Sequence, residues 1–103
     1  MNKKKYKKKI ISILKKIYDP EINISIYDIG LIYKINIKNN NVFILMTLTT
    51  PNCPLANVII NKIKKKIKKK IKIINNVYIN ITFNPPWNKN MINKKVKLEL
   101  DIL

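Results

Sequence analysis

The chain has 103 residues, one cysteine, no histidine and a formal net charge of +17, so it is long enough for one small domain with a single core. The lack of histidine excludes a Cys–His pair for acyl transfer, and one cysteine cannot complete a four-ligand zinc or iron–sulfur site within one chain. A single cysteine also excludes an internal disulfide, which is typical of a reducing compartment. No apolar run approaches the roughly 20 residues of a membrane span. We therefore expect a cytoplasmic protein without a membrane span, and not an enzyme, because these groups are a poor set for catalytic turnover.

The positive charge comes from lysine alone. All 22 basic residues are lysines, against five acidic residues, and lysine, asparagine and isoleucine together fill 61 of the 103 positions, as in proteins from AT-rich genomes. Lysine coats phosphates, but base recognition relies largely on the arginine fork. We interpret the charge as mainly compositional and expect nucleic-acid binding to be at most nonspecific and weakened by salt. A polyanion-binding module that uses the lysine-rich face of residues 62–72 is the alternative.

The first predicted element is an amphipathic helix over residues 3–18, with a frayed basic start at about residues 1–8. Its apolar residues recur at helical spacing on one stripe: Tyr6, Ile10, Ile13, Leu14 and Ile17. The sequence Asp19-Pro20-Glu21 is expected to end this helix, because a residue that precedes proline avoids helical geometry.

The rest of the chain predicts a small mixed sheet covered by a second helix. The apolar residues of that helix also recur at helical spacing: Leu55, Val58, Ile59, Ile63, Ile67 and Ile71. The expected elements are a strand at 31–38, a turn at 39–41, a strand at 42–49, a helix from about 54 to 72, a strand at 77–83 and a short helix that opens at Ile92 and Asn93. The sequence therefore predicts one α+β domain over residues 1–103, with the order α-β-β-α-β-α, two layers and a three-stranded mixed sheet.

Two single residues are expected to shape the loops. Gly30 is the only glycine, and without a Cβ it can take a positive φ or allow close approach of the backbone, so we assign it the sharp bend before Leu31. Trp87 follows two prolines in the loop after the third strand. It is expected to anchor the core or an interface, and beside the cysteine it could form the wall of a site.

Cys53 lies where the chain changes from strand to helix. Pro54 suits the first helical position, which needs no N–H, and this places Cys53 at the N-cap. Unpaired N–H groups and the positive end of the helix dipole favour a thiolate there, with a pKa of about 3.5–7.5 rather than the usual value of about 8.5. A thiolate binds soft metals and attacks electrophiles. The alternative is a small buried cysteine that fills a gap in the core.

Hydroxyls and carboxylates could surround this thiolate. Thr49 and Thr50 precede it in the turn, and Asp19, Glu21 and Asp28 are three of only five acids and lie close together in sequence. The alternative for these acids is a helix stop followed by a turn, in which Asp28 accepts hydrogen bonds from loop N–H groups. A thiolate beside carboxylates suits transient handling of a soft metal, with a partner or a second protomer supplying the other ligands.

Four blocks of the sequence stand in a distinctive order and spacing: Asp19-Pro20-Glu21-Ile22, Asp28-Ile29-Gly30-Leu31-Ile32-Tyr33, Met46-Thr47-Leu48-Thr49-Thr50-Pro51-Asn52-Cys53-Pro54-Leu55 and Asn84-Pro85-Pro86-Trp87. Over nearly the whole chain they resemble the SufT/PaaD-type family of iron–sulfur cluster assembly and metal–sulfur cluster maturation factors. The resemblance implies a two-layer α+β domain of the iron–sulfur cluster assembly type. This agrees with the order of elements predicted from the residues.

The resemblance also implies which residues form the site. It implies Cys53 as the reactive, cluster-contacting or metal-contacting residue, within a pocket formed by Asp19, Glu21, Thr49, Thr50 and Asn52. Gly30, Pro54 and Trp87 take structural roles. The sequence departs from the family at Asn84 and at Lys94 and Lys95, where acids are common, and at Asn52, where a small residue is common. The first departure removes support for a metal-binding role of the final loop.

The function implied by the resemblance is that of a non-enzymatic accessory factor in iron–sulfur cluster assembly or delivery. Cys53 would accept or stabilise a transient iron–sulfur cluster, iron or a persulfide on its way to a client. The expected partners are the Suf-like assembly machinery and client apo-proteins, with a homodimer as one source of the missing ligands. The alternatives are the polyanion-binding module and a PaaD-like accessory subunit of an oxygenase system.

Overall fold

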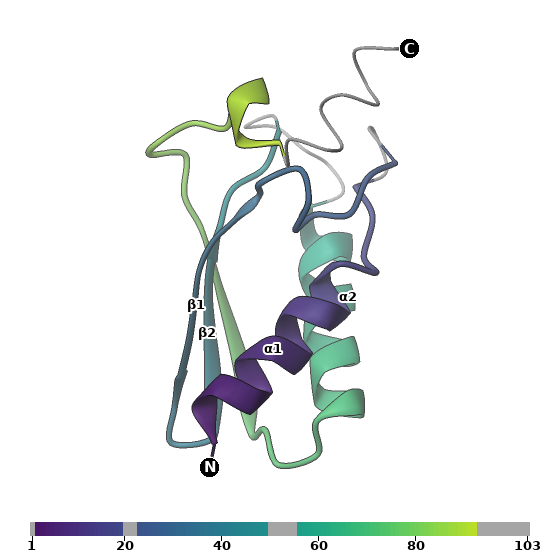
Figure 1. Cartoon of the computed structure of the whole chain (residues 1–103), viewed down its shortest axis with the longest axis vertical. Helices are drawn as coiled ribbons and strands as arrows, with labels where there is room; N and C mark the ends of the chain where they lie inside the picture. The colour runs from purple at the N-terminus through teal and green to yellow at the C-terminus, as the bar shows by residue number, and fades with distance from the viewer. Residues whose placement is uncertain (1, 20–22, 50–55, 93–103) are drawn as a thin grey trace.

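The computed structural model describes residues 2–19, 23–49 and 56–92. Its elements are α1 (Lys3–Leu14), β1 (Ile32–Lys38), β2 (Asn41–Met46), α2 (Ala56–Lys70), β3 (Asn76–Ile81) and the 3-10 helix η1 (Lys89–Met91) (Figure 1). They confirm the α+β class and the predicted order up to the third strand. α1 begins at Lys3, within the basic start where we expected fraying, and the side chain of Asn2 caps it by accepting a hydrogen bond from the Lys5 amide (3.1 Å).

β2 is the central strand of the sheet, which has the order β1-β2-β3 and therefore β1 and β3 at its edges. β1 and β2 pair antiparallel, and Asn39 and Asn40 close this hairpin with positive φ angles of 51° and 62°. Asparagine tolerates this conformation, and a two-residue type I′ turn requires it at both positions. β2 and β3 pair parallel. A parallel pair needs a crossover connection, and α2 is its helix.

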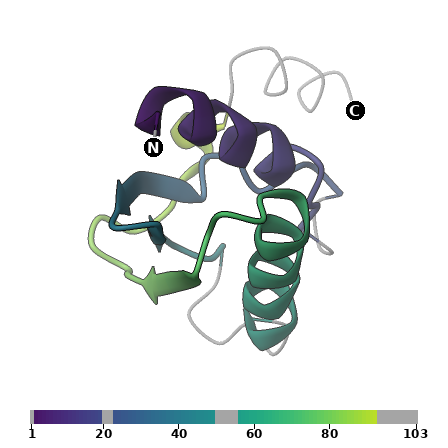
Figure 2. The ribbon, with the colours of Figure 1, turned by 90° about the horizontal axis from the view of Figure 1, so that it is seen from below.

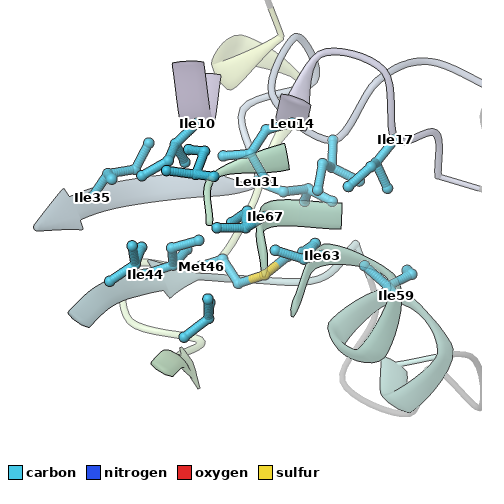
Figure 3. Close-up of a cluster of buried hydrophobic side chains, with 14 of the residues drawn as sticks. Ile10, Leu14, Ile17, Leu31, Ile35, Ile44, Met46, Ile59, Ile63 and Ile67 are labelled. Atoms are coloured by element: carbon cyan, nitrogen blue, oxygen red, sulfur yellow. The ribbon is translucent and has the colours of Figure 1, made fainter. Parts of the chain in front are cut away.

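Both helices cover the same face of the sheet, and the core lies between the two layers (Figure 2). α1 contacts β1, α2 contacts β3, and the two helices contact each other. In Figure 3, isoleucines from both helices point toward the strands. The side chains of this core are aliphatic apart from one methionine, and they include Ile10, Leu14, Ile35, Ile37, Val42, Ile44, Met46, Ile59, Ile63, Ile67 and Val77. Such burial stabilises the fold by about 1.5–3 kcal/mol for each large aliphatic side chain.

The opposite face of the sheet carries polar and aromatic side chains. Along β2, Phe43 is exposed while its neighbours in the strand, Val42 and Ile44, are buried, so the strand alternates between the two faces. The ring of Phe43 stacks on the exposed ring of Tyr78 from β3, with 5.2 Å between the ring centroids. Lys34 on β1 is exposed as well.

The first helix is shorter than the predicted range of 3–18. α1 ends at Leu14, because the backbone beyond it pairs with the following loop. The carbonyl of Ile17 accepts a hydrogen bond from the Ile26 amide (2.8 Å), and the amide of Asp19 donates to the carbonyl of Ile24 (2.9 Å). The amides of Lys15, Lys16 and Ile17 still donate back to carbonyls of the last helical turn, but the carbonyl of Ile17 and the amide of Asp19 bond to the loop and do not continue the helix.

The second and third strands are also shorter than predicted. β2 ends at Met46 instead of residue 49, and β3 ends at Ile81 instead of residue 83. Met46 pairs with Ile32, the first residue of β1, and with Ile81, the last residue of β3, so the chain beyond it has no neighbouring strand to pair with. η1 ends at Met91, and Ile92, where we expected the last short helix to open, has an extended backbone (φ -68°, ψ 138°), so the structure tests that prediction at this one residue only. Asn93 and the rest of the chain lie outside the described residues.

α2 buries one stripe and exposes its other faces. Ile59, Ile63 and Ile67 are buried, as their spacing predicts, whereas Val58 lies off the stripe and is 59% exposed. The helix ends at Lys70, two residues before its predicted end. Within the described ranges, no helix has both the length and the apolar composition needed to cross a membrane.

We expect Ile63→Ala to lower the free energy of unfolding by about 2–5 kcal/mol, because Ile63 is completely buried and its truncation leaves a cavity between the layers. Val58→Ala is the matched control on the same helix, and its exposed side chain predicts a change within about 0.5 kcal/mol. Urea denaturation followed by circular dichroism measures both values. Equal losses would contradict the assignment of the core stripe.

Candidate functional site

Several loops gather at one end of the molecule, beside the end of β2 and the start of α2 (Figure 1). The amide of Thr47, just past β2, donates to the carbonyl of Leu31, just before β1 (2.9 Å). This bond joins the end of β2 to the start of β1. The indole Nε1–H of Trp87 donates to the carbonyl of Ile29 (2.6 Å). Residues far apart in the sequence are therefore held together by hydrogen bonds at this end.

The loop after α1 has a defined backbone. Tyr18 and Ser25 form an antiparallel bridge, and the amide of Asn23 donates to the carbonyl of Asp19 (2.8 Å). Asn23 has a positive φ of 60°, which asparagine tolerates better than most residues. These bonds fix the backbone of Asp19 on the inner side of the loop, where its side chain is only 3% exposed.

Asp28 acts within its own turn. Its Oδ2 accepts a hydrogen bond from the hydroxyl of Ser25 (2.8 Å), and the Ser25 Oγ accepts one from the Asp28 amide (3.0 Å). This reciprocal pair agrees with the interpretation of Asp28 as a turn residue. The Asp28 carboxylate, however, accepts its hydrogen bond from the Ser25 hydroxyl and not from a loop N–H. Its role is therefore to hold the loop that carries Asp19.

Buried polar side chains concentrate at this end. Among the described residues, the buried polar or charged ones are Asp19, Ser25 and Thr47, and all three lie in the loop after α1 or directly after β2. Thr49 is half-buried in the same segment as Thr47. Burial of a polar group costs free energy unless it has a hydrogen-bond partner. Buried polar side chains outside the aliphatic core therefore indicate a functional site or a loop that they stabilise.

Gly30 brings the C-terminal 3-10 helix against the loop. It has the positive φ (84°) that we expected, and its amide donates to the carbonyl of Tyr27 (3.1 Å). A Cβ at this position would overlap the carbonyl oxygen and carbon of Met91. The missing Cβ thus permits both the bend and the close approach of η1. The hydroxyl of Tyr33 donates to the carbonyl of Pro85 (2.7 Å) and thereby joins this region to the loop after β3.

The structure locates only part of the predicted site. It describes Asp19 and Gly30 in the loop between α1 and β1, Thr49 in the segment after β2, and Trp87 hydrogen-bonded to the carbonyl of Ile29 in that loop. The other predicted site residues lie outside the described residues: Glu21, Thr50, Asn52, Cys53 and Pro54. The N-cap position of Cys53 therefore stays a prediction. In the part of the chain that the structure describes, no three His, Cys, Asp or Glu side chains form a group that could hold a metal ion.

Sequence reasoning missed two residues of this region. Thr47 is completely buried after β2, and the signal for it is one hydroxyl residue between the apolar residues Met46 and Leu48. Ser25 forms the reciprocal pair with Asp28, and its signal is a serine three residues before an acid, a spacing at which the two side chains bond locally.

Known proteins share this architecture. The structure superposes with a TM-score of 0.91 on a crystal structure of a domain of unknown function from Bacillus anthracis, at 32% identity and over 100% of this chain and 98% of that chain. The described elements thus form a two-layer α+β fold of a known type. Residues 7–83 match the family of iron-sulfur cluster assembly proteins, so the chain belongs to this family.

Relatives of known name are similar along most of their length. The "Fe-S protein maturation auxiliary factor" of Porphyromonas gingivalis is 41% identical over 91% of this chain and 90% of the relative. The "Fe-S protein maturation auxiliary factor SufT" of Staphylococcus aureus is 36% identical over 84% of this chain and 98% of the relative. The resemblance to the SufT-type family is confirmed.

We expect Gly30→Ala to lower the free energy of unfolding by about 3 kcal/mol or more, because it adds a clash with Met91 to the cost of a positive φ. Asn40→Ala is the matched control: its φ is also positive (62°), and backbone strain alone predicts a loss of about 1–2 kcal/mol. Thermal and urea unfolding compare the two variants. A loss at Gly30 no larger than at Asn40 would mean that η1 does not press on the glycine.

Proposed function

We propose that this protein is a non-enzymatic accessory factor in the maturation of iron–sulfur proteins. The observation that carries the proposal is the family match over residues 7–83, a range that includes Cys53. The names of the relatives, which are auxiliary factors of Fe-S protein maturation, support it further. We place its action in the cytoplasm, where a protein with one cysteine keeps its thiol reduced.

In this proposal, Cys53 is the group that contacts the cargo. The cargo is an iron–sulfur cluster, iron or a persulfide in transit, and the thiolate is the ligand that such species prefer. Cys53 is the only cysteine and histidine is lacking, so the chain supplies at most one thiolate and no imidazole. The remaining ligands come from the donor scaffold, from the client or from a second copy of this chain. Transfer is then an exchange of ligands, in which Cys53 binds before the last donor ligand leaves.

The neighbours of Cys53 are assigned to the electrostatics of the pocket. Asp19 is buried at the end of the molecule to which the segment of Cys53 connects, and its charge would stabilise iron beside the thiolate. Glu21 would add a second carboxylate. The hydroxyls of Thr49 and Thr50 and the amide of Asn52 would donate hydrogen bonds to the cluster sulfides or to the thiolate. Such bonds tune iron–sulfur ligation elsewhere.

We expect Cys53→Ser to remove the stimulation of client activation by this protein, because a serine hydroxyl is a poor ligand for iron–sulfur cargo. The measurement is anaerobic activation of apo-aconitase by a cluster-loaded scaffold, with and without the protein. Val58→Ala is the control: it changes an exposed side chain of the first turns of α2 without altering any ligand. If Cys53→Ser stimulates as well as the wild type, the thiol mechanism is wrong. If the wild type itself does not stimulate, the maturation role is wrong.

We expect Asp19→Asn to weaken retention of iron by about tenfold, because it keeps the shape of the side chain but removes a buried carboxylate that we assign to the cargo pocket. Asp28→Asn is the matched control, since it removes the same charge from the same loop while the carboxylate serves only the Ser25 turn. Anaerobic iron titration with a competing chelator measures retention, and melting temperatures report any loss of fold. Equal weakening by the two variants would mean that Asp19 acts only through the net charge.

A further inference from the structure

A groove lies between α1 and α2, near the C-terminal end of α2, with a volume of about 510 Å³. Five lysines line it, four from the two helices and Lys16 from just past α1: Lys9, Lys16, Lys66, Lys69 and Lys70. We call it the lysine groove. The residues that line it include no acid, and the two acids of the described residues, Asp19 and Asp28, belong to the loop after α1. Five ammonium groups around one groove repel one another, so an anionic partner would relieve repulsion as well as gain attraction.

The groove also has apolar lining residues. Besides the lysines, Ser12 and Ile13 from α1 and Ile71, just past α2, line it, and we call the two isoleucines the isoleucine floor. Ile13 is half-buried and packs against the core, and Ile71 is 3% exposed, so both are held rigidly. Lysine stems add apolar surface below their charged ends. An occupant that matches this groove has apolar side chains on one side and carboxylates along its margins.

This combination fits a protein segment better than a nucleic acid. Recognition of single-stranded nucleic acids relies on exposed aromatic rings for base stacking and largely on arginine for base edges. No aromatic residue lines the groove, arginine is lacking in the chain, and the stacked pair of Phe43 and Tyr78 lies on the opposite face of the sheet. An amphipathic helix that presents apolar residues at helical spacing is the usual occupant of a groove between helices.

We propose that the lysine groove docks an acidic amphipathic helix of a partner protein. The inference goes beyond the proposed function, because it requires neither Cys53 nor a cluster. Charge complementarity provides the attraction and speeds the encounter, and the isoleucine floor selects for an apolar stripe on the partner.

The position of the groove gives the docking a use. Lys66 to Lys70 form the last turns of α2, whereas Ala56, at the other end of the same helix, follows the segment that carries Cys53. Fifteen helical residues span about 22 Å. A partner held in the lysine groove would therefore leave the cysteine end of the molecule accessible to a second protein.

The test uses the full chain and a fluorescein-labelled peptide probe of about four helical turns, with leucines at helical spacing on one face and glutamates elsewhere. A second probe has the same composition with the leucines scattered. Binding is measured by fluorescence anisotropy at roughly 150 mM salt, where weak surface attraction is screened. We expect the amphipathic probe to bind at least about tenfold more tightly than the scattered one, because only it can place leucines on the isoleucine floor.

Two triple variants of α2 locate the binding. K66E/K69E/K70E reverses the charges that line the groove, and K62E/K65E/K68E reverses three exposed lysines that do not line it. Both change the net charge by the same amount. We expect the first to weaken binding of the amphipathic probe by about tenfold or more and the second by about threefold or less.

Each other outcome overturns the proposal in a defined way. Equal weakening by the two variants would mean attraction to net charge alone, and equal binding of the two peptides would mean that the floor is not used. Tighter binding of oligo-deoxythymidine than of the amphipathic peptide, with the same dependence on Lys66, Lys69 and Lys70, would assign the groove to nucleic acid. Chemical-shift mapping on the ¹⁵N-labelled wild type decides the case if a variant does not fold. Shifts of the amide signals away from Ile13, Lys66 and Ile71 would reject the groove.

Discussion

The architecture depends on the burial of one isoleucine stripe. Ile59, Ile63 and Ile67 lie at successive turns of α2 and fill the space between that helix and the strands (Figure 3). Because β2 and β3 run parallel, the chain must return over the sheet between them, and the stripe determines which face the returning helix covers. The direction of β2 then determines the end of the molecule at which the chain leaves the sheet toward α2.

The molecule has two ends of different character. At one end, buried polar side chains such as Asp19 and Thr47 lie in loops tied together by hydrogen bonds, and the only cysteine belongs to the segment of sequence that follows Thr49. Near the other end of α2, lysines from two helices border an apolar floor. The length of α2 separates its start, which follows the cysteine segment, from the lysines of its last turns. The proposed handling of cargo and the proposed docking of a partner would then use different ends of that helix.

Local patterns of sequence account for much of the fold. The spacing of Ile63 and Ile67 is enough to predict a buried stripe on a helix, and two adjacent asparagines are enough to predict the hairpin turn. The end of α1 could not be predicted, because whether the carbonyl of Ile17 continues a helix or accepts the amide of Ile26 depends on where the loop folds back. The local sequence around Gly30 likewise does not predict that Met91, about sixty residues later in the chain, packs against it.

The candidate site was accessible to prediction for a different reason. A unique cysteine and a group of acids stand out in a chain dominated by lysine, asparagine and isoleucine, so Cys53 and Asp19 could be selected by residue type. Thr47 is buried because the strands on both sides of β2 end beside it, and residue type alone gives no sign of this burial.

The high lysine content also affects β1, which is an edge strand of the described sheet. An isoleucine-rich strand with an unpaired edge invites pairing with another molecule, and Lys34 and Lys38 on β1 place charge along that edge, so a composition that looks like drift also opposes aggregation.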